Sequence, residues 1–122
     1  MEGPFFLFQS IVNLMVHQTS AGHIRICEKV DHGTYIVRHV GWSDSNVKAE
    51  ILKHVGDKIF MFFNFEYADS PRQAYEKACM DHHEFHATLT DKTHPRKPEG
   101  TDYTCPVKGC EHGENNDPSS LL

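Results

Sequence analysis

The chain has 122 residues, enough for one domain with a modest hydrophobic core and too few for two. Its hydrophobic fraction of 39% and charged fraction of 24% are ordinary for a globular domain. The formal net charge of −5 provides no general attraction to phosphates, so nucleic-acid binding would need a local basic patch.

The N-terminal segment, residues 1–20, is predicted to be an apolar extension of the domain. Its apolar run from Phe5 to Val16 fits a helix about as well as an irregular strand, and its type stays open. The run is too short to span a bilayer, and no basic segment of a secretory signal precedes it. We therefore expect a cytoplasmic protein with no membrane partner.

The next segment reads as a β-hairpin. From Gly22 to Val30 apolar and polar residues alternate, which predicts a strand with one buried face. Residues 31–33 form a turn signal that ends in glycine, and the β-branched and aromatic residues of 34–40 predict a second strand.

A helix, a strand and a second helix are predicted to follow the hairpin. Residues 47–55 have helical spacing after a run of capping residues. Residues 58–67 are rich in phenylalanine, which suits a strand buried on both faces. The Ser-Pro-Arg-Gln sequence at 70–73 is a capping box with proline in the first turn, and it predicts a helix over 71–86.

The expected fold is therefore α+β in the order β-β-α-β-α. We predict a small mixed or antiparallel three-stranded sheet flanked by helices, within a single domain covering residues 21–112. Prolines and glycines make the chain irregular from Asp91 onward, and the polar residues 113–122 are expected to be disordered.

Four potential soft-metal ligands lie in two places of this sequence. Cys79 and His83 are four residues apart on one face of the second helix, and Cys105 and Cys110 flank a short Pro-Val-Lys-Gly loop. Three thiolates and one imidazole are a common tetrahedral zinc set, so we predict a structural Zn²⁺ that fastens the tail. The alternative is that the cysteines are buried as small hydrophobic residues. Possible substitutes for one ligand are His82, His86, His94 and His112.

Three stretches of the chain resemble the GIY-YIG nuclease superfamily. The string His-Val-Gly-Trp-Ser-Asp-Ser-Asn at 39–46, before a helix ending in Ile-Leu-Lys-His at 51–54, resembles the second half of its signature. Ala-Tyr-Glu-Lys at 74–77 is similar to the helix with the family's metal-binding glutamate. Residues 94–101, with the Cys-Pro and Cys that follow, resemble the tail of a bacterial subgroup. Together the match covers about residues 22–110.

The resemblance implies a GIY-YIG-like core that cleaves phosphodiester bonds of DNA or RNA with Mg²⁺. Glu76 would hold the metal, and His39 or Tyr35 would lie near the attacking water. The chain departs from the family by carrying Ile24 at the first-motif tyrosine position, unless Tyr35 is its counterpart, and Glu50 where an arginine is usual. A carboxylate there repels phosphate, so a catalytically degraded relative is expected rather than an active nuclease.

Two alternatives come from other functional classes. One is a non-catalytic, zinc-stabilised module that binds nucleic acid or protein. His39 would then be an ordinary strand histidine and Glu76 a solvated helix residue. The other, a redox-active dithiol protein, is disfavoured because the chain has no Cys-x-x-Cys motif. No pattern points to a small-molecule substrate, and the oligomeric state is left open.

Overall fold

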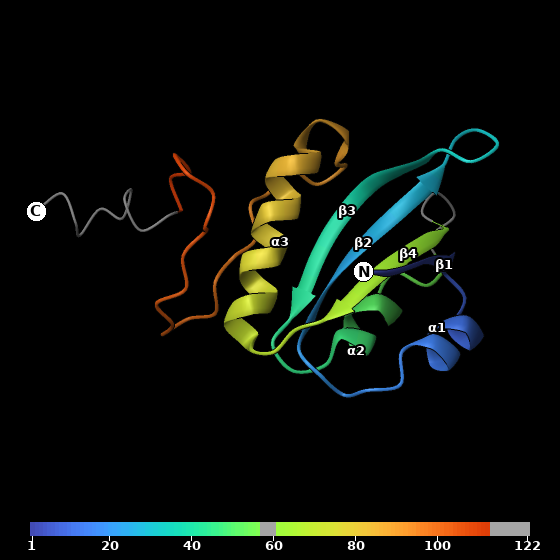
Figure 1. Ribbon diagram of the computed structural model, residues 1–122, viewed down its shortest axis with the longest axis horizontal. Coiled ribbons are helices and arrows are strands. Elements are labelled where there is room, and N and C mark those ends of the chain that lie inside the picture. The colour runs from blue at the N-terminus through green and yellow to red at the C-terminus, as the bar shows by residue number, and fades with distance from the viewer. Residues whose placement is uncertain (57–60, 113–122) are drawn as a thin grey trace, which may run out of the picture.

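The computed structural model, described for residues 1–56 and 61–112, has a four-stranded antiparallel sheet with helices on both faces (Figure 1). The spatial order of the strands is β1-β4-β2-β3. The elements along the chain are β1 (Glu2–Phe6), α1 (Gln9–Met15), β2 (Gly22–Lys29), β3 (Tyr35–Ser43), α2 (Val47–Leu52), β4 (Phe62–Tyr67), α3 (Pro71–Phe85) and the short 3₁₀ helix η1 (His86–Thr88).

The predicted α+β class is confirmed, and the elements from β2 to α3 follow the predicted β-β-α-β-α order. The sheet has four strands instead of three, because the N-terminal segment supplies β1, which pairs with β4. The same segment supplies α1. Its pattern was ambiguous because a strand and a helix follow one another within a few residues. The predicted start of the third strand at 58–60 and the predicted disorder of 113–122 lie outside the described residues.

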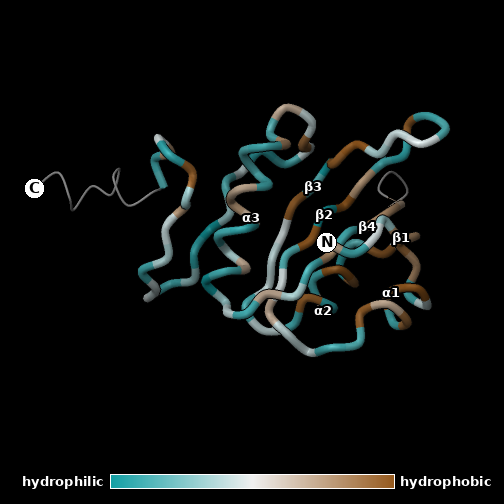
Figure 2. The backbone as a smooth tube through the Cα atoms, in the orientation of Figure 1, coloured by the Kyte–Doolittle hydropathy of each residue, from teal (hydrophilic) through white to brown (hydrophobic). Residues whose placement is uncertain are grey.

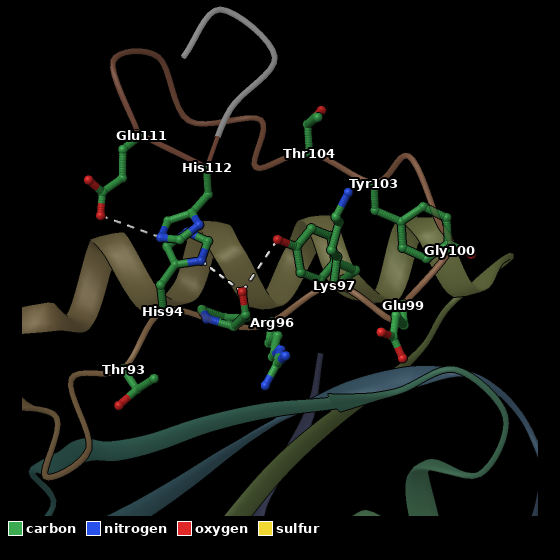
Figure 3. Close-up of a pocket in the computed structure, with 12 residues that line it drawn as sticks. Thr93, His94, Arg96, Lys97, Glu99, Gly100, Tyr103, Thr104, Glu111 and His112 are labelled. Carbon is green, nitrogen blue, oxygen red and sulfur yellow. Dashed lines mark hydrogen bonds and ion pairs between the residues drawn. The ribbon is translucent and has the colours of Figure 1, made fainter. Parts of the chain in front are cut away.

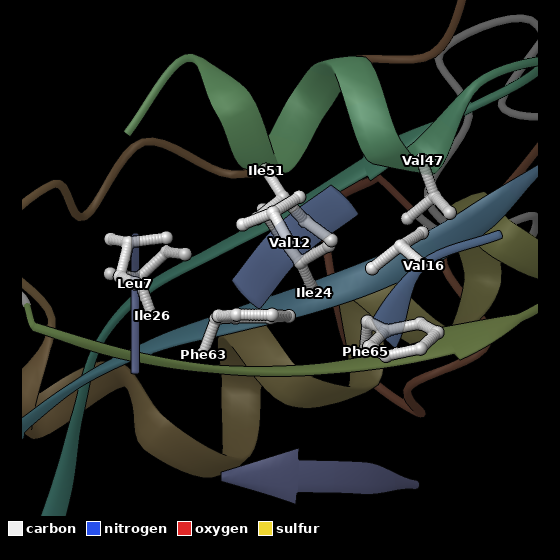
Figure 4. Packing of buried hydrophobic residues seen from close by; sticks show 9 residues of the cluster. All are labelled: Leu7, Val12, Val16, Ile24, Ile26, Val47, Ile51, Phe63 and Phe65. Carbon is white, nitrogen blue, oxygen red and sulfur yellow. The ribbon is translucent and has the colours of Figure 1, made fainter. Parts of the chain in front are cut away.

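The main hydrophobic core lies between the sheet and the helices α1 and α2 (Figure 4). Alternation along β2 turns Ile24 and Ile26 toward this core, and both side chains have no solvent exposure. Strand β4 lies between β1 and β2 and contributes Phe63 and Phe65, in keeping with a central strand. The other members of the cluster are Leu7, Val12, Val16, Val47 and Ile51.

Helix α3 packs on the opposite face of the sheet, against β2 and β3. The predicted cap is present: Ser70 Oγ accepts from the Gln73 backbone N–H at 3.1 Å, and Gln73 Oε1 accepts from the Asp69 N–H at 2.8 Å. Ala74 and Ala78, both fully buried, face inward along this helix. Among the described residues, no helix has the length and apolar character needed to cross a membrane.

A buried ion pair joins α3 to the sheet. Figure 2 shows that α3 is largely hydrophilic, so apolar burial contributes less here than under α1 and α2. Asp81 on α3 accepts two hydrogen bonds from the guanidinium of Arg25 on β2, at 2.8 and 2.9 Å. His23 Nε2 lies 3.5 Å from the same carboxylate, and burial lowers the pKa of this histidine. The bidentate geometry fixes how far along β2 the helix lies.

Removing this carboxylate should destabilise the protein. The Asp81→Ala variant leaves Arg25 without its charged partner, and breaking a buried pair typically costs about 3–5 kcal/mol. Arg25 retains 28% side-chain exposure and can reach water, so we expect a smaller loss than for a fully buried pair, about 2–3 kcal/mol, in urea unfolding. The matched control is Asp44→Ala, because Asp44 is exposed; it should change the unfolding free energy little. Equal stability of the two variants would contradict a fastening role for Asp81.

Candidate metal centre

The tail that follows α3 runs back beside the helix and brings four ligand-type side chains together (Figure 1). His83 comes from α3, whereas His94, Cys105 and Cys110 come from the irregular tail. One ligand atom from each of the four lies within 4.8 Å of the others. This arrangement can hold a metal ion.

Hydrogen bonds orient the ligands. His94 Nδ1 lies 2.8 Å from the carbonyl oxygen of Pro95, which can only accept, so Nδ1 carries the proton and donates it (Figure 3). The lone pair is then on Nε2, which lies 3.5 Å from Cys110 Sγ. The Tyr75 hydroxyl donates to the same Pro95 carbonyl at 3.3 Å. Partners of this kind set the tautomer and ring direction of metal-binding histidines.

The Cys-Pro-Val-Lys-Gly-Cys loop is folded as a tight turn. The Cys110 N–H donates to the Val107 carbonyl at 3.2 Å, and Gly109 has a φ of +84°, a value that favours glycine. The Cys105 N–H donates to the His112 carbonyl at 3.0 Å, and the His112 N–H points at Cys110 Sγ at 3.4 Å. The fold of this loop therefore places the thiols of Cys105 and Cys110 close together, within the metal-binding group.

The four residues differ at one position from the set predicted from the sequence. His83, Cys105 and Cys110 are brought together as expected, but the fourth member of the cluster is His94. Cys79 has no solvent exposure and packs in an apolar cluster with Tyr75 and the other two cysteines. Burial raises the pKa of the Cys79 thiol, as it does for Cys105. What separates the two is position, because the group of ligand atoms that lie within 4.8 Å of one another includes Cys105 and not Cys79. The sequence pattern identifies His94 only as a possible substitute, because its position depends on how the tail folds back.

Further histidines surround this centre. The rings of His82 and His94 have centroids 5.2 Å apart, and the ring of His112 stacks on that of His94 at 4.1 Å. Burial, with the neighbouring imidazoles, lowers the pKa of His82 to about 4. Its Nδ1 has no hydrogen-bond partner among the described residues. His82 therefore adds a neutral imidazole beside the centre.

The three residues predicted to be catalytic are not brought into one site. His39 on β3 pairs with Ile26, so its side chain points to the face covered by α1 and α2. Glu76 belongs to α3, which packs on the opposite face. Tyr35 lies near the other end of β3, where its ring meets the edge of Phe62 at 5.1 Å. Burial, with the neighbouring His54, lowers the pKa of His39, so this imidazole is neutral at pH 7.

Comparisons of the chain with protein-family models, with curated proteins and with solved structures found no match. What the site does is therefore argued from its own geometry.

The ligand set in the structure and the set predicted from the sequence differ in which variant should lose the metal. His94→Gln should remove the metal, whereas Cys79→Ala should retain about one equivalent by elemental analysis of the purified protein. Loss of the metal should also lower the melting temperature, since the ligands join the tail to α3. Cys27→Ala, a buried cysteine outside the cluster, is the matched control. Metal retained in His94→Gln and lost in Cys79→Ala would restore the three-cysteine set.

Proposed function

We propose that this protein is a non-catalytic binding module, in which a structural zinc ion fastens the tail on α3 and thereby forms a site for single-stranded nucleic acid. A pocket of about 810 Å³ carries the proposal. All of its lining residues except Tyr75 belong to residues 93–112, the segment that contains three of the four metal ligands (Figure 3). The pocket therefore depends on the fastening of the tail.

The donor set supports zinc as the metal. Two thiolates and two imidazoles form a closed tetrahedral set typical of structural zinc sites. Zn–S and Zn–N bonds of about 2.3 and 2.05 Å at tetrahedral angles separate sulfur and nitrogen by roughly 3.5 Å. The separation of Cys110 Sγ and His94 Nε2 is 3.5 Å, so these two atoms need little movement to bind one ion.

The pocket combines cationic and aromatic side chains. Arg96 and Lys97 line it, and the charge of Lys97 also acts on the carboxylate of Asp102. Lys97 Nζ donates to the Thr101 carbonyl, at 2.9 Å. Tyr103 also lines the pocket, and the guanidinium of Arg72 lies over its ring at 4.9 Å. Cationic side chains beside an aromatic ring suit single strands, which present both phosphates and base faces.

Acidic residues limit the strength and length of such a contact. Glu99 and Glu111 also line the pocket, and the chain as a whole is negative. The field of the whole molecule therefore repels a long polyanion, and we expect a short segment to bind through the local patch.

The GIY-YIG nuclease hypothesis has less support from the geometry. A single catalytic ion would need Glu76 and His39 within reach of each other. They lie on elements at opposite faces of the sheet, and Glu50 stands where the resemblance calls for a cation. This hypothesis remains a prediction from the sequence motifs.

Binding can be measured with a short fluorescently labelled DNA or RNA oligonucleotide by anisotropy at low salt. Replacing both pocket cations, Arg96→Gln with Lys97→Gln, should weaken binding by about tenfold or more, because two phosphate contacts are lost. Lys48→Gln, on α2 and outside the pocket, is the matched control. His94→Gln should abolish binding by releasing the tail. Equal affinity of the double variant and the Lys48 variant would contradict this ligand.

The non-catalytic character has its own test. Incubation with Mg²⁺ and either plasmid or branched DNA should leave the substrates intact at all enzyme-to-substrate ratios. Cleavage that is lost in Glu76→Ala but kept in the exposed-surface variant Glu84→Ala would establish the nuclease hypothesis instead.

A further inference from the structure

Two thiols of the tail lie close together beside a second cavity. The Sγ atoms of Cys105 and Cys110 are within 4.8 Å of each other. The cavity has a volume of about 580 Å³, and Cys110 is the only described cysteine that lines it. Cys110 has 8% residual exposure, whereas Cys105 has 3% and Cys79 has none. A small solute that enters the cavity therefore reaches Cys110 before the other thiols of this cluster.

We propose that Cys105 and Cys110 are an oxidation site, at which a hydroperoxide such as hydrogen peroxide converts the two thiols into a disulfide. Cys110 is the thiol that reacts with the peroxide, and Cys105 is the thiol that then closes the disulfide. The effect of the disulfide on the tail rests on the proposed zinc ion. The disulfide itself requires only the two thiols.

The contacts of Cys110 are those of an activated thiol. Its Sγ lies 3.5 Å from His94 Nε2, the ring nitrogen that carries the lone pair. The other ring nitrogen donates to the Pro95 carbonyl, so the acceptor of the thiol proton is itself oriented by a third group. The His112 N–H donates to the same sulfur at 3.4 Å and stabilises negative charge on it. In the metal-free chain, these contacts prepare Cys110 to act as a nucleophile.

The oxidation balances in two steps. The Cys110 sulfur attacks one oxygen of hydrogen peroxide, the O–O bond breaks, and the departing hydroxide takes the thiol proton by way of His94 and leaves as water. The sulfur is oxidised to a sulfenic acid, and the peroxide is reduced. The Cys105 sulfur then attacks the sulfenic sulfur, the S–O bond breaks, and the hydroxyl group leaves as a second water with the Cys105 proton. Two thiols and one peroxide thus give one disulfide and two waters.

The position of Cys105 makes it the partner of Cys110 in this bond. The side chain of Cys105 hydrogen-bonds to those of Cys79 and Cys110. The Cys110 N–H donates to the Val107 carbonyl, which folds the loop so that Cys105 and Cys110 approach each other. The two sulfur atoms must close to about 2.05 Å, a movement that both side chains of a short loop can share. Cys79 is held on α3 without exposure and stays a thiol.

Oxidation would remove two of the four candidate metal ligands at once. Metal ions bind the thiolate form of cysteine, and the sulfurs of a disulfide are no longer thiolates. The two remaining histidines, His83 and His94, do not make a closed four-ligand set. The disulfide also lies wholly within the tail, so it does not replace the link from the tail to α3. The metal-bound and disulfide forms are therefore alternative states of the tail, fastened and released.

The test treats the full chain, reduced and free of metal, with equimolar hydrogen peroxide, followed by alkylation, trypsin and mass spectrometry. Trypsin cleaves after Lys108, between the two cysteines, so the disulfide should join peptide 97–108 to peptide 109–122. Cys79 lies in a third peptide, 78–92, and should be alkylated, as should Cys27. Any other disulfide, or four alkylated thiols after the treatment, would overturn the proposal.

Variants assign the two roles. In Cys105→Ala, oxidation of Cys110 should stop at the sulfenic acid, which dimedone traps as one adduct on peptide 109–122. Cys110→Ala should give no adduct on Cys105 at the same peroxide concentration, and an adduct there would reverse the assignment. Cys79→Ala is the matched control, because it removes a buried thiol outside the pair, and it should form the same disulfide as the natural chain. Circular dichroism confirms that each variant folds.

A second measurement connects the disulfide with the metal. On treatment with peroxide, the zinc-loaded chain should release about one equivalent of zinc to a chromogenic chelator, and dithiothreitol should restore zinc binding. Zinc retained by a chain that carries the Cys105–Cys110 disulfide would contradict the two alternative states. The proposed function fails separately: absence of oligonucleotide binding leaves the disulfide map unchanged, and absence of the disulfide leaves binding by the reduced chain untouched.

Discussion

The Arg25–Asp81 ion pair fixes the position of α3, the helix on which the candidate metal centre and the pocket depend. Helix α3 presents few large apolar side chains to the sheet, and alanines line much of its inner face. Small residues allow the helix to approach closely, yet they specify its position along the strands only loosely. Two hydrogen bonds from one guanidinium to one carboxylate set that position, since both must be made together. The ion pair therefore fixes the position of α3 along β2 more than it raises the net free energy of unfolding.

The tail depends on α3 in turn. Residues 93–112 contain no helix or strand, so they gain little from regular backbone hydrogen bonding and have a large conformational entropy to lose. What holds them is a set of contacts to α3: Tyr75 to the Pro95 carbonyl, Arg72 to Asp102, the apolar cluster in which Tyr75 and Cys79 pack against Cys105, Cys110, Tyr103 and Val107, and the four-residue candidate metal cluster. The first two are single polar contacts, and the second lies at the surface. A metal ion bound by the cluster would add several bonds at once, and its binding energy would become folding energy for such a segment.

Local signals in the sequence predicted the parts of the fold that depend on neighbours in the chain. The capping box at Ser70 fixed the start of α3, and the alternation at Ile24 and Ile26 marked the buried face of β2. The segment before residue 20 was harder, because its apolar residues serve a strand and a helix in succession. For the metal cluster, the i, i+4 spacing and the cysteine loop identified its elements. Spacing could not decide between Cys79 and His94. That choice depends on which face of α3 points toward the tail and on where the tail lies against the helix. Both are set by tertiary structure.

The region around Gly41 shows how one change of charge alters what a scaffold can bind. The motif resemblance calls for an arginine at the position of Glu50, where a cation would attract a phosphate group. A carboxylate at this place has the opposite preference, because it repels phosphate and attracts cations. Under the resemblance, this change of charge alone makes the region unsuited to phosphodiester binding.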